Sequence, residues 1–390
     1  MSNNLSSHFL LREDVTFLNH GSYGACPRPV FEAYQAWQLE LEREPVEFLG
    51  RKPTENMRLP REILAKELGT TAENIVGVTN STTGLNIVAQ SLDLRPGDQI
   101  LTTDHEYSAL EKTWAYVARK TGAEIVVVKI PMPLETEAQF TDALLAGMTD
   151  RTRVLFLSHI TSATALLFPI ERAVAEARHR GILSIIDGAH APGQIHLNLE
   201  TLGADFYAGN CHKWMMAPKG SAFLYARPEV QNLLNPLVIS HGWTTQSKDP
   251  GARGAFGNSP FVDEIEMQGT RDPAPWLAVP AALKFRAEND WWAITDHCSA
   301  LARETAARVA EMTGLSPLSA EQFRAPQMAA MPIPECDPLE VRKILFERYG
   351  IEIPVHRWQN HHIARVSVQG YNSRPQMDKL ISALGEIFGF

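Results

Sequence analysis

An alternation of short apolar runs with helical patterns, between residues 74 and 226, is the feature that most constrains the fold of this chain. Strands are predicted for the runs rich in β-branched and apolar residues, at 75–78, 99–103, 124–130, 153–157, 182–186, 205–208 and 222–225. Helical patterns lie between several of them, at 83–91, up to Lys120 and at 170–180. Strands that are apolar along their whole length are typical of a sheet covered on both faces. The sequence therefore predicts an α/β fold, with a three-layer αβα domain around a mainly parallel sheet.

The pattern changes after about residue 242. Residues 242–273 are rich in Gly, Pro and polar side chains, which predicts a long irregular segment, and we expect residues 240–263 to shape a pocket. A strong helical pattern follows at 280–312. Further strands and helices are predicted at 327–333, 339–349, 364–368 and 376–388. These elements predict a smaller C-terminal α/β domain, so that the chain has two domains.

The composition excludes several classes of partner. The chain of 390 residues has a formal net charge of −9 and no basic stripe, so nucleic acid and anionic membranes are not expected partners. The N-terminal residues lack a secretory pattern, and no apolar run approaches the roughly 18–20 residues that span a bilayer. The cysteines, Cys26, Cys211, Cys298 and Cys336, are scattered and form no CxxC pair or metal-ligand cluster. We therefore expect a cytoplasmic protein with free thiols and no metal site.

Polar residues follow five of the predicted strands. They lie at 81–83, 104–107, 159–162, 187–190 and 210–213. In open α/β sheets, ligands bind beyond the carboxyl ends of the strands. One polar strand end is commonplace, but five in one sheet predict a binding site.

Asp187 and Lys213 indicate the chemistry of this site. Asp187 ends an apolar strand, where a carboxylate is costly unless a cation pairs with it. Lys213 comes after the next strand, amid Trp and Met residues. Taken singly, the aspartate could be an ordinary loop cap and the lysine an ordinary surface residue. Together they match what pyridoxal phosphate needs, a lysine that forms a Schiff base and an acid at the ring nitrogen.

Other needs of this cofactor also have candidate residues. Residues 80–84 (NSTTG) lie between a strand and a helix, where hydroxyls and free backbone N–H groups bind phosphate, although the run is also a plain helix N-cap. Tyr107 is a candidate for stacking on the cofactor ring, and its alternative is a core tyrosine. Arg365 is a candidate for binding an amino-acid carboxylate through two hydrogen bonds. Its alternative is a solvated arginine on an edge strand.

Longer runs of sequence carry a family resemblance. They are Thr103–Tyr107 (TDHEY), Asp187–Gly193 (DGAHAPG), Ala204–Trp214 (ADFYAGNCHKW), Gly269–Asp272 (GTRD), Pro275–Ala282 (PWLAVPAA) and Leu18–Gly24 (LNHGSYG). Across nearly the whole chain, they resemble the class V aminotransferase group of fold-type I pyridoxal phosphate enzymes, and within it most closely the isopenicillin N epimerases. The resemblance implies an enzyme that uses pyridoxal 5′-phosphate to act at the α-carbon of an amino acid, or of a compound that contains one.

The resemblance also implies roles for individual residues. Lys213 would carry the cofactor and move protons, and Asp187 would pair with the pyridine nitrogen. Arg365 would bind the substrate carboxylate, and Asn19 and Tyr23 would line the substrate side. The other implied cofactor contacts are Ser81, Thr82 and Thr83, Tyr107 on the ring face, Ser162, His190 near the ring hydroxyl, Asn210 and His212.

The division and assembly of the chain follow from the same resemblance. It implies an N-terminal segment at 1–30 that packs with the small domain, a large cofactor-binding domain at 31–270 and a small C-terminal domain at 271–390. Thr270 falls where this group reaches the phosphate from the second subunit. We therefore expect a homodimer with shared active sites.

One departure from the family pattern is informative. Cysteine desulfurases of this group carry a nucleophilic cysteine in a loop shortly before the carboxylate-binding arginine. Here residues 354–362 (PVHRWQNHH) contain no cysteine, so a persulfide-forming desulfurase is disfavoured. His361 and His362 are expected to lie in this loop rather than at a metal, since adjacent histidines rarely converge on one ion.

Three reactions fit the same residues. An epimerase or racemase, the main hypothesis, would remove the α-proton and return it to the other face. A C–S or other β/γ-lyase would use the same carbanion to expel a leaving group, and an aminotransferase would move the proton to the cofactor. A non-enzymatic scaffold is disfavoured by intact Lys213 and Asp187. The family resemblance alone does not choose among the reactions.

Overall fold

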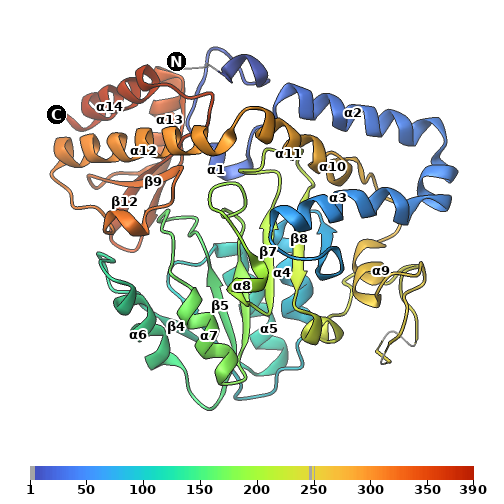
Figure 1. Cartoon of the computed structure of the whole chain (residues 1–390). Helices are drawn as coiled ribbons and strands as arrows, with labels where there is room; N and C mark the ends of the chain where they lie inside the picture. Colours follow the sequence, from blue (N-terminus) through green and yellow to red (C-terminus); the bar gives the residue numbers. More distant parts are fainter. Residues whose placement is uncertain (1–4, 246–247, 250) are drawn as a thin grey trace.

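A computed structural model gives the structure of residues 5–245, 248–249 and 251–390 (Figure 1). Residues 1–4 of the predicted N-terminal segment lie outside the described residues, as do residues 246–247 and 250 of the segment predicted to shape a pocket. A large sheet with helices on both sides adjoins a smaller unit formed by the C-terminal residues. Among the described residues, no helix has the length and apolar character needed to cross a membrane.

The central sheet has seven strands in the order β2-β8-β7-β6-β5-β3-β4. Their bounds are β2 Ile75–Val78, β3 Gln99–Thr103, β4 Glu124–Val128, β5 Thr152–Ser158, β6 Leu183–Asp187, β7 Phe206–Asn210 and β8 Ala222–Ala226. Strand β8 runs antiparallel to β2 and β7, and all other neighbours are parallel. The predicted α/β class with a mainly parallel sheet is confirmed, and each strand lies within two residues of its predicted run.

Alternating side chains of the strands form two hydrophobic cores, one on each face of the sheet. In β5, Leu155 and Leu157 belong to one core, whereas Val154 and Phe156 belong to the other, since successive side chains of a strand point to opposite faces. The first core includes side chains of α6 (Glu137–Gly147) and α7 (Glu171–His179), and the second those of α4 (Ser81–Ser91) and α5 (Ser108–Thr121). This is the predicted three-layer arrangement.

Helix α4 begins earlier than the sequence pattern predicts. The side chain of Asn80 accepts a hydrogen bond from the backbone N–H of Thr83 at 2.8 Å, so Asn80 is the N-cap and Ser81 the first helical residue. The predicted start at Thr83 is therefore wrong. The first turn of α4 is polar, so the apolar periodicity that predicts a helix is absent there.

The C-terminal residues form an antiparallel sheet in the order β11-β12-β9, packed with helices. The elements are β9 Met328–Ile333, β11 Val355–Trp358, β12 His361–Ser367, α12 Trp291–Thr313, α13 Pro338–Tyr349 and α14 Arg374–Phe388. Their buried side chains, among them Val309, Leu345 and Leu380, form a third core. Strand β1 (Thr16–Phe17) pairs in parallel with β10 (Ile351–Glu352), so the N-terminal segment contacts this unit.

Residues 354–362 differ from the sequence prediction. They were expected to form a loop, but they form β11, a turn and the start of β12. His361 and His362 therefore lie on a strand, not in a loop. The hairpin was hidden by its polar His, Arg, Gln and Asn residues, which give neither a helical nor a strand period.

The segment 242–273 is also more regular than predicted. It contains α9 (Pro260–Glu266), whose N-cap Ser259 accepts a hydrogen bond from the backbone N–H of Val262. Pro260 occupies the first helical turn, where its missing N–H costs nothing. The sequence pattern did not predict α9, because its capped start lies among Gly and Pro residues that indicate irregular structure.

A buried ion pair fixes α9 against the sheet and against α3 (Pro53–Glu67). Nη1 of Arg61 in α3 lies 2.6 Å from Oε2 of Glu266, and both side chains are more than nine-tenths buried. Oε1 of Glu266 accepts a hydrogen bond from the backbone N–H of Gly77 in β2 at 3.0 Å. One carboxylate therefore joins three elements, and either charge would be uncompensated without the other.

We expect Arg61→Ala to lower the free energy of unfolding by about 3–5 kcal/mol, because it leaves the Glu266 charge buried without its partner. Urea denaturation measures this loss. The matched control is Arg58→Ala on the same helix, since Arg58 pairs with Glu62 at 3.4 Å in a position exposed to solvent. That change should cost less than about 1 kcal/mol. Equal losses in the two variants would contradict the role of the buried pair.

Candidate active site

Lys213 lies in the loop after β7, at the carboxyl end of the central sheet. Its Nζ is 3.2 Å from Nε2 of His190, and the residue is half-buried. Loss of hydration and the nearby Arg365 guanidinium lower the pKa of Lys213 to about 7, against the opposing effect of Asp187. An amine with such a pKa is partly neutral near pH 7 and can act as a nucleophile and a base.

Asp187 is the last residue of β6 and is buried between the neighbouring strands β5 and β7. Its Oδ1 accepts a hydrogen bond from the backbone N–H of Ala189 at 2.9 Å. Burial raises the pKa of this carboxyl, while the hydrogen bond and the charge of Lys213 act in the opposite direction. The structure thus brings the two residues predicted to be catalytic within electrostatic reach of each other.

The indole of Trp214 orients the ring of His190 beside Lys213. Nε1 of Trp214 donates a hydrogen bond to Nδ1 of His190 at 3.4 Å, so the proton of a neutral His190 lies on Nε2. Burial lowers the pKa of His190 well below its usual range, and the nearby cations lower it further. His190 is therefore a neutral ring that can donate from Nε2 to the amine of Lys213.

The N-terminal helix α1 (His20–Tyr23) packs directly against the lysine loop. Nε2 of His20 donates a hydrogen bond to the backbone oxygen of Lys213 at 3.0 Å. Gly24 has φ +71°, and a Cβ there would lie 1.9 Å from the backbone oxygen of His212, so only glycine fits. This contact gives a physical reason for the run Leu18–Gly24.

Helix α11 (Val279–Glu288) supports the other side of the loop. Nη1 of the buried Arg286 donates to the backbone oxygen of Trp214 at 2.8 Å, and Nη2 donates to that of Gly193 at 3.2 Å. Two separate segments therefore hold the backbone around Lys213, which limits the positions that its amine can take.

Arg365 lies on β12, the central strand of the C-terminal sheet, and is only 5% exposed. The alternative of a solvated edge arginine is therefore wrong. Nη1 donates to the backbone oxygen and the hydroxyl of Ser162, and Nη2 lies 3.3 Å from the hydroxyl of Ser22. Its Nε has no partner among the described residues. Burial lowers the pKa of Arg365 to about 10, so it stays cationic at neutral pH.

The N-terminus of α4 presents groups that suit a phosphate. The hydroxyl of Ser81 is buried and has no partner among the described residues. The backbone N–H of Ser81 donates to Oδ1 of Asn210 at 2.9 Å, which links α4 to the end of β7. The hydroxyl of Thr83 is within 3.1 Å of Oδ1 of Asn80, so it takes part in the helix cap. Thr82 lies beside it in the first turn.

The remaining predicted residues are placed less closely together. Tyr107 precedes α5 and is 43% exposed, so the alternative of a core tyrosine is wrong. His212 donates from Nδ1 to the backbone oxygen of Ser221 at 3.1 Å. Asn19 bonds to Glu352 at 3.3 Å. Tyr23 is 74% exposed, and Thr270 is exposed at the edge of a different cavity.

Two polar residues of the site were missed by sequence reasoning. The carboxyl of Glu106 is buried and accepts hydrogen bonds from Thr103 at 2.7 Å and from Ser158 at 2.6 Å. Burial raises its pKa to about 8, against the opposing effect of the hydrogen bonds from Ser158 and Thr103 and with a smaller contribution from the charge of Asp187. Ser22 contacts Arg365. Both residues belong to the sequence runs that carry the family resemblance. The signal for Glu106 was its position just after a strand, and the signal for Ser22 was its position close to Asn19.

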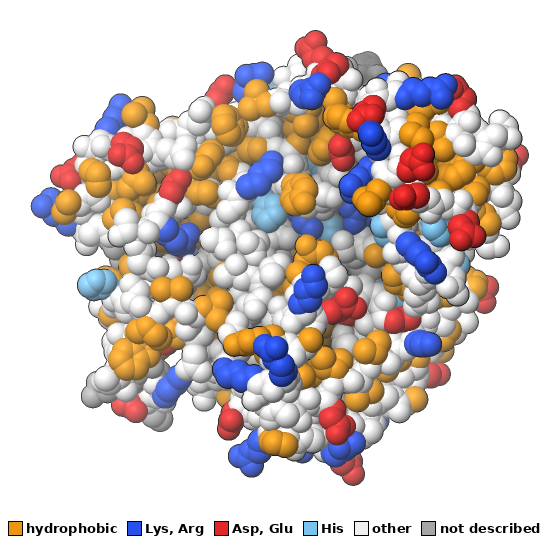
Figure 2. Space-filling model, turned by 180° about the vertical axis from the view of Figure 1, so that it is seen from behind, with side chains coloured by type: hydrophobic (Ala, Val, Ile, Leu, Met, Phe, Trp, Pro, Cys, Tyr) orange, Lys and Arg blue, Asp and Glu red, His pale blue; other side chains and the backbone are white. Residues whose placement is uncertain are grey.

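Cationic and histidine side chains also gather on the surface. On the face opposite to that of Figure 1, Lys, Arg and His side chains lie across the upper middle, with Asp and Glu side chains among them (Figure 2). Among the described residues, no group of three or more His, Cys, Asp or Glu side chains is arranged to hold a metal ion.

Comparison with known proteins identifies the family. The model of the family "Aminotransferase class-V" matches residues 26–380. The chain belongs to this family. It is therefore a member of a family of enzymes, and the family cofactor is pyridoxal 5′-phosphate.

The relatives of this family member differ in named reaction. Isopenicillin N epimerase of Streptomyces clavuligerus is 36% identical over 389 residues, which cover 97% of this chain and 96% of the relative. A probable chloroplastic L-cysteine desulfhydrase of Arabidopsis thaliana is 26% identical, over 88% of this chain and 75% of the relative. A cysteine desulfurase structure from Thermococcus onnurineus NA1 has a TM-score of 0.83 at 20% identity, covering 99% and 97% of the two chains, and confirms the fold.

The family cofactor fits the described residues. The buried hydroxyl of Ser81, without a partner among the described residues, suits a phosphate oxygen at the N-terminus of α4. The lowered pKa of Lys213 leaves part of its amine neutral near pH 7, and the neutral amine is the form that bonds to an aldehyde. Oδ2 of Asp187 accepts no hydrogen bond from the described residues and is free for a ring nitrogen. Burial of the orphan Nε of Arg365 likewise suits an anionic ligand.

The cofactor-free protein should show a pH-dependent stability that comes from Lys213. Its folded pKa of about 7 lies below the unfolded value of about 10.4, so the unfolded chain binds more protons between these values. The free energy of unfolding should therefore rise with pH across this window. Relative to Lys213→Met, the rise should approach about 1.4 kcal/mol per pH unit between pH 8 and 10.

Urea denaturation at several pH values measures this difference. The control is Lys284→Met, because Lys284 lies on α11 in an exposed pair with Glu288. This change should leave the slope unaltered. A wild-type slope equal to that of Lys213→Met would contradict the lowered pKa.

Proposed function

We propose that this protein is an epimerase or racemase that uses pyridoxal phosphate at the α-carbon of an amino acid, or of a compound containing one. The observation that supports it most is that Lys213, in the loop after β7, lies close enough to Asp187 at the end of β6 and to Arg365 on β12 for both charges to act on its amine. The relative named isopenicillin N epimerase, similar along nearly the whole chain, favours epimerisation over the other reactions.

Each of these residues has a proposed task. When bound, pyridoxal phosphate withdraws electrons from the substrate α-carbon and makes its proton acidic. Lys213 holds the cofactor and, once released by the substrate, takes and returns the proton at that carbon, for which a pKa of about 7 is suited. Asp187 keeps the ring nitrogen protonated through its free carboxylate oxygen. Arg365 binds the substrate carboxylate and fixes the plane in which the α-carbon reacts.

The other predicted contacts complete the proposal. Ser81, Thr82 and His212 are assigned to the phosphate, together with the backbone of the first turn of α4. Ser162 positions Arg365 through the hydrogen bonds described above. Asn19 and Tyr23 lie on the same N-terminal segment as Ser22, which contacts Arg365, and we assign them to the substrate side. The remaining assignments to the cofactor are Thr83, Tyr107, His190 and Asn210.

A C–S lyase is the second candidate. The desulfhydrase relative supports it, since it is 26% identical along most of this chain. A desulfurase that forms a persulfide is disfavoured, because the hairpin of β11 and β12 that leads to Arg365 contains no cysteine. Both candidates use Lys213, Asp187 and Arg365 in the same roles.

We further propose a cytoplasmic homodimer with shared active sites, which acts on small molecules and not on nucleic acid or membranes. The domain division at residues 30 and 270 is part of this proposal. Thr270 is exposed and lines a cavity that includes none of the other predicted site residues, which supports its use by a second copy.

The reaction is tested by incubating a panel of amino acids and amino-acid compounds, isopenicillin N included, with the holoenzyme in D₂O. We expect one substrate to gain α-deuterium and lose optical purity, with no keto acid, ammonia or sulfur product. Chiral chromatography and mass spectrometry measure both changes. Lys213→Ala is the control, and it should lose both exchange and racemisation, because no amine then reaches the α-carbon.

Other outcomes would reassign the reaction. Stoichiometric release of a keto acid or of sulfide without racemisation would identify a lyase. Transfer of the amine to an added keto acid would identify an aminotransferase.

Sharing of the sites is tested by mixing two defective variants. Lys213→Ala chains are inactive, and Thr270→Ala chains should bind the cofactor more weakly and lose most activity. In a hybrid dimer, one site would combine an intact Lys213 with an intact Thr270 from the other chain. We expect refolded mixtures to regain activity that neither variant has alone. Activity no greater than the sum of the two separate variants would contradict a shared site.

A further inference from the structure

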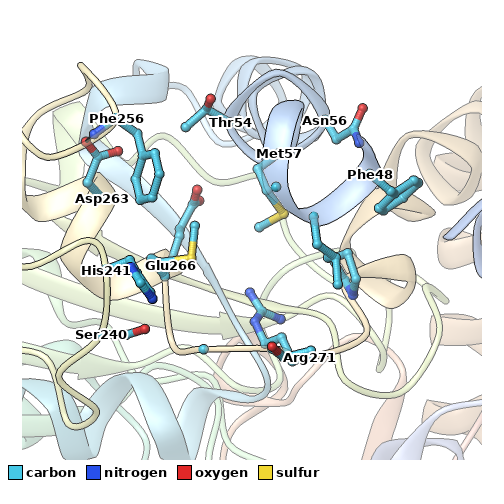
Figure 3. A pocket seen from close by; sticks show the side chains of 16 residues that line it. Phe48, Thr54, Asn56, Met57, Ser240, His241, Phe256, Asp263, Glu266 and Arg271 are labelled. Carbon is cyan, nitrogen blue, oxygen red and sulfur yellow. Dashed lines mark hydrogen bonds between the residues drawn. The ribbon is translucent and has the colours of Figure 1, made fainter. Parts of the chain in front are cut away.

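The cavity lined by Thr270, of about 480 Å³, lies between α3, α9 and the segment that follows α9 (Figure 3). Because we assign Thr270 to the cofactor of a second copy, this cavity belongs to the shared site of the proposed dimer. None of the described residues that line it lies in the turn between β3 and α5, which carries Tyr107.

The turn that joins β3 to α5 is held by the side chains of three consecutive residues. Oδ2 of Asp104 accepts a hydrogen bond from Nε2 of Gln359 at 2.6 Å, and Nδ1 of His105 lies 2.8 Å from the hydroxyl of Thr164. The third residue, Glu106, is the one whose side chain is bonded to two strands of the central sheet.

The carboxyl of Glu106 connects the ends of these two strands. Oε1 lies 2.7 Å from the hydroxyl of Thr103, the last residue of β3, and Oε2 lies 2.6 Å from the hydroxyl of Ser158, the last residue of β5. Ser158 is in turn paired with Asp187 in the register of β5 and β6. Glu106 is only 8% exposed, so little water competes for these bonds. The turn is therefore fixed relative to the strand end that carries Asp187.

Tyr107 depends on this turn for its position. It occupies the N-cap position of α5, and its side chain, 43% exposed, makes no hydrogen bond or ring contact with the described residues. Its backbone oxygen accepts a hydrogen bond from the backbone N–H of Leu110 at 2.8 Å. The ring is therefore placed mainly by the backbone that carries it, and Glu106 fixes that backbone to the sheet from the position directly before Tyr107.

The charge state of Glu106 suits such a contact. Burial raises its pKa to about 8, which favours the protonated carboxyl at neutral pH. A protonated carboxyl can donate a hydrogen bond to one hydroxyl and accept one from the other, so that no charge is buried. The amide of glutamine has the same capacity and nearly the same shape. Glu106→Gln is therefore the conservative substitution, whereas Glu106→Ala removes both bonds.

We propose that Glu106 is a positioning residue, which holds Tyr107 on the face of the cofactor ring through its bonds to Thr103 and Ser158. This role rests on the assignment of Tyr107 to pyridoxal phosphate made above, and not on the type of reaction. One carboxyl thus ties the turn that carries the residue at the ring face to the strand end beside Asp187, the residue at the ring nitrogen.

Binding of pyridoxamine phosphate to the cofactor-free full chain tests this role. The probe carries the ring and phosphate of the cofactor but forms no Schiff base with Lys213, so its binding is reversible and titration calorimetry can measure it. Tyr107→Ala should weaken binding about tenfold, because the ring loses its stacking partner. Glu106→Ala should weaken it about fivefold, and Glu106→Gln less than about twofold.

A double variant shows whether Glu106 acts through Tyr107. In the Tyr107→Ala background, Glu106→Ala should weaken binding by less than about a further twofold, because no ring is left to be positioned. General damage to the fold would weaken binding equally in both backgrounds. Circular dichroism of the cofactor band in the holoenzyme is a second readout. It should fall in both alanine variants, because the ring is held less rigidly.

Two further variants support the comparison. Ser158→Ala removes one of the two bonds and leaves Glu106 in place, so it should cause a smaller loss with the same dependence on Tyr107. It decides the question by the same comparison if Glu106→Ala does not fold. Glu111→Ala is the matched control, since Glu111 is an exposed glutamate in the first turn of α5. It should bind the probe as the wild type does.

Two results would overturn the role of Glu106. One is wild-type affinity in Glu106→Ala, and the other is a loss of the same size with and without Tyr107. Wild-type affinity in Tyr107→Ala would refute the assignment of Tyr107 to the cofactor, and the role of Glu106 with it. A holoenzyme that shows the expected pattern but catalyses no epimerisation would refute the proposed reaction and leave this role standing.

Discussion

Removal of water from the amine of Lys213 is the constraint on which the rest of the site depends. A lysine in water is a cation and neither a nucleophile nor a base at neutral pH, whereas burial and Arg365 lower the pKa of Lys213 to about 7. This state needs a tightly packed loop. Helix α1 reaches the loop through His20 and Gly24, and α11 reaches it through Arg286. The reactivity of the Lys213 amine thus depends on segments that lie far from it in the sequence on both sides.

The charges around Lys213 act on its pKa in opposite directions, and neither forms an ion pair with the amine. Asp187 lies close enough to raise the pKa of Lys213, but its own carboxyl is buried and costly to ionise. Burial raises the pKa of Glu106, which lies just beyond the carboxyl end of β3, to about 8, so protonation is favoured there. Arg365 is a second cation near Lys213. A ligand that brings negative groups would relieve the repulsion between the two cations. The same repulsion thus lowers the pKa of Lys213 and favours the binding of an anionic ligand.

The unit built on the central sheet and the C-terminal unit meet where these charged side chains lie. Lys213 and Asp187 come from the carboxyl end of the central sheet, whereas Arg365 comes from the middle of the C-terminal sheet. Ser162 of the first unit accepts from Arg365, and Ser22 of the N-terminal segment approaches it from another side. The substrate carboxylate would therefore be held by a residue whose position depends on how the units pack, and the reacting carbon would lie beside residues at the carboxyl end of the sheet that α1 and α11 support. Relatives of this chain bear the names of different reactions, so membership of the family does not by itself fix the reaction.

The sequence by itself determined the αβα architecture, since apolar strand runs and helical periods are local signals that burial on both faces of a sheet imposes. It also placed Asp187 and Lys213 at strand ends, because parallel strands bring their carboxyl ends to one edge. It did not reveal the polar first turn of α4, the hairpin of β11 and β12, or helix α9, whose residues carry weak periodicity. Only the tertiary structure decided that Arg365 is buried on a central strand and that Glu106 is enclosed. These properties depend on which segments, distant in the sequence, pack around a side chain and exclude water from it. A local sequence pattern carries no information on that packing.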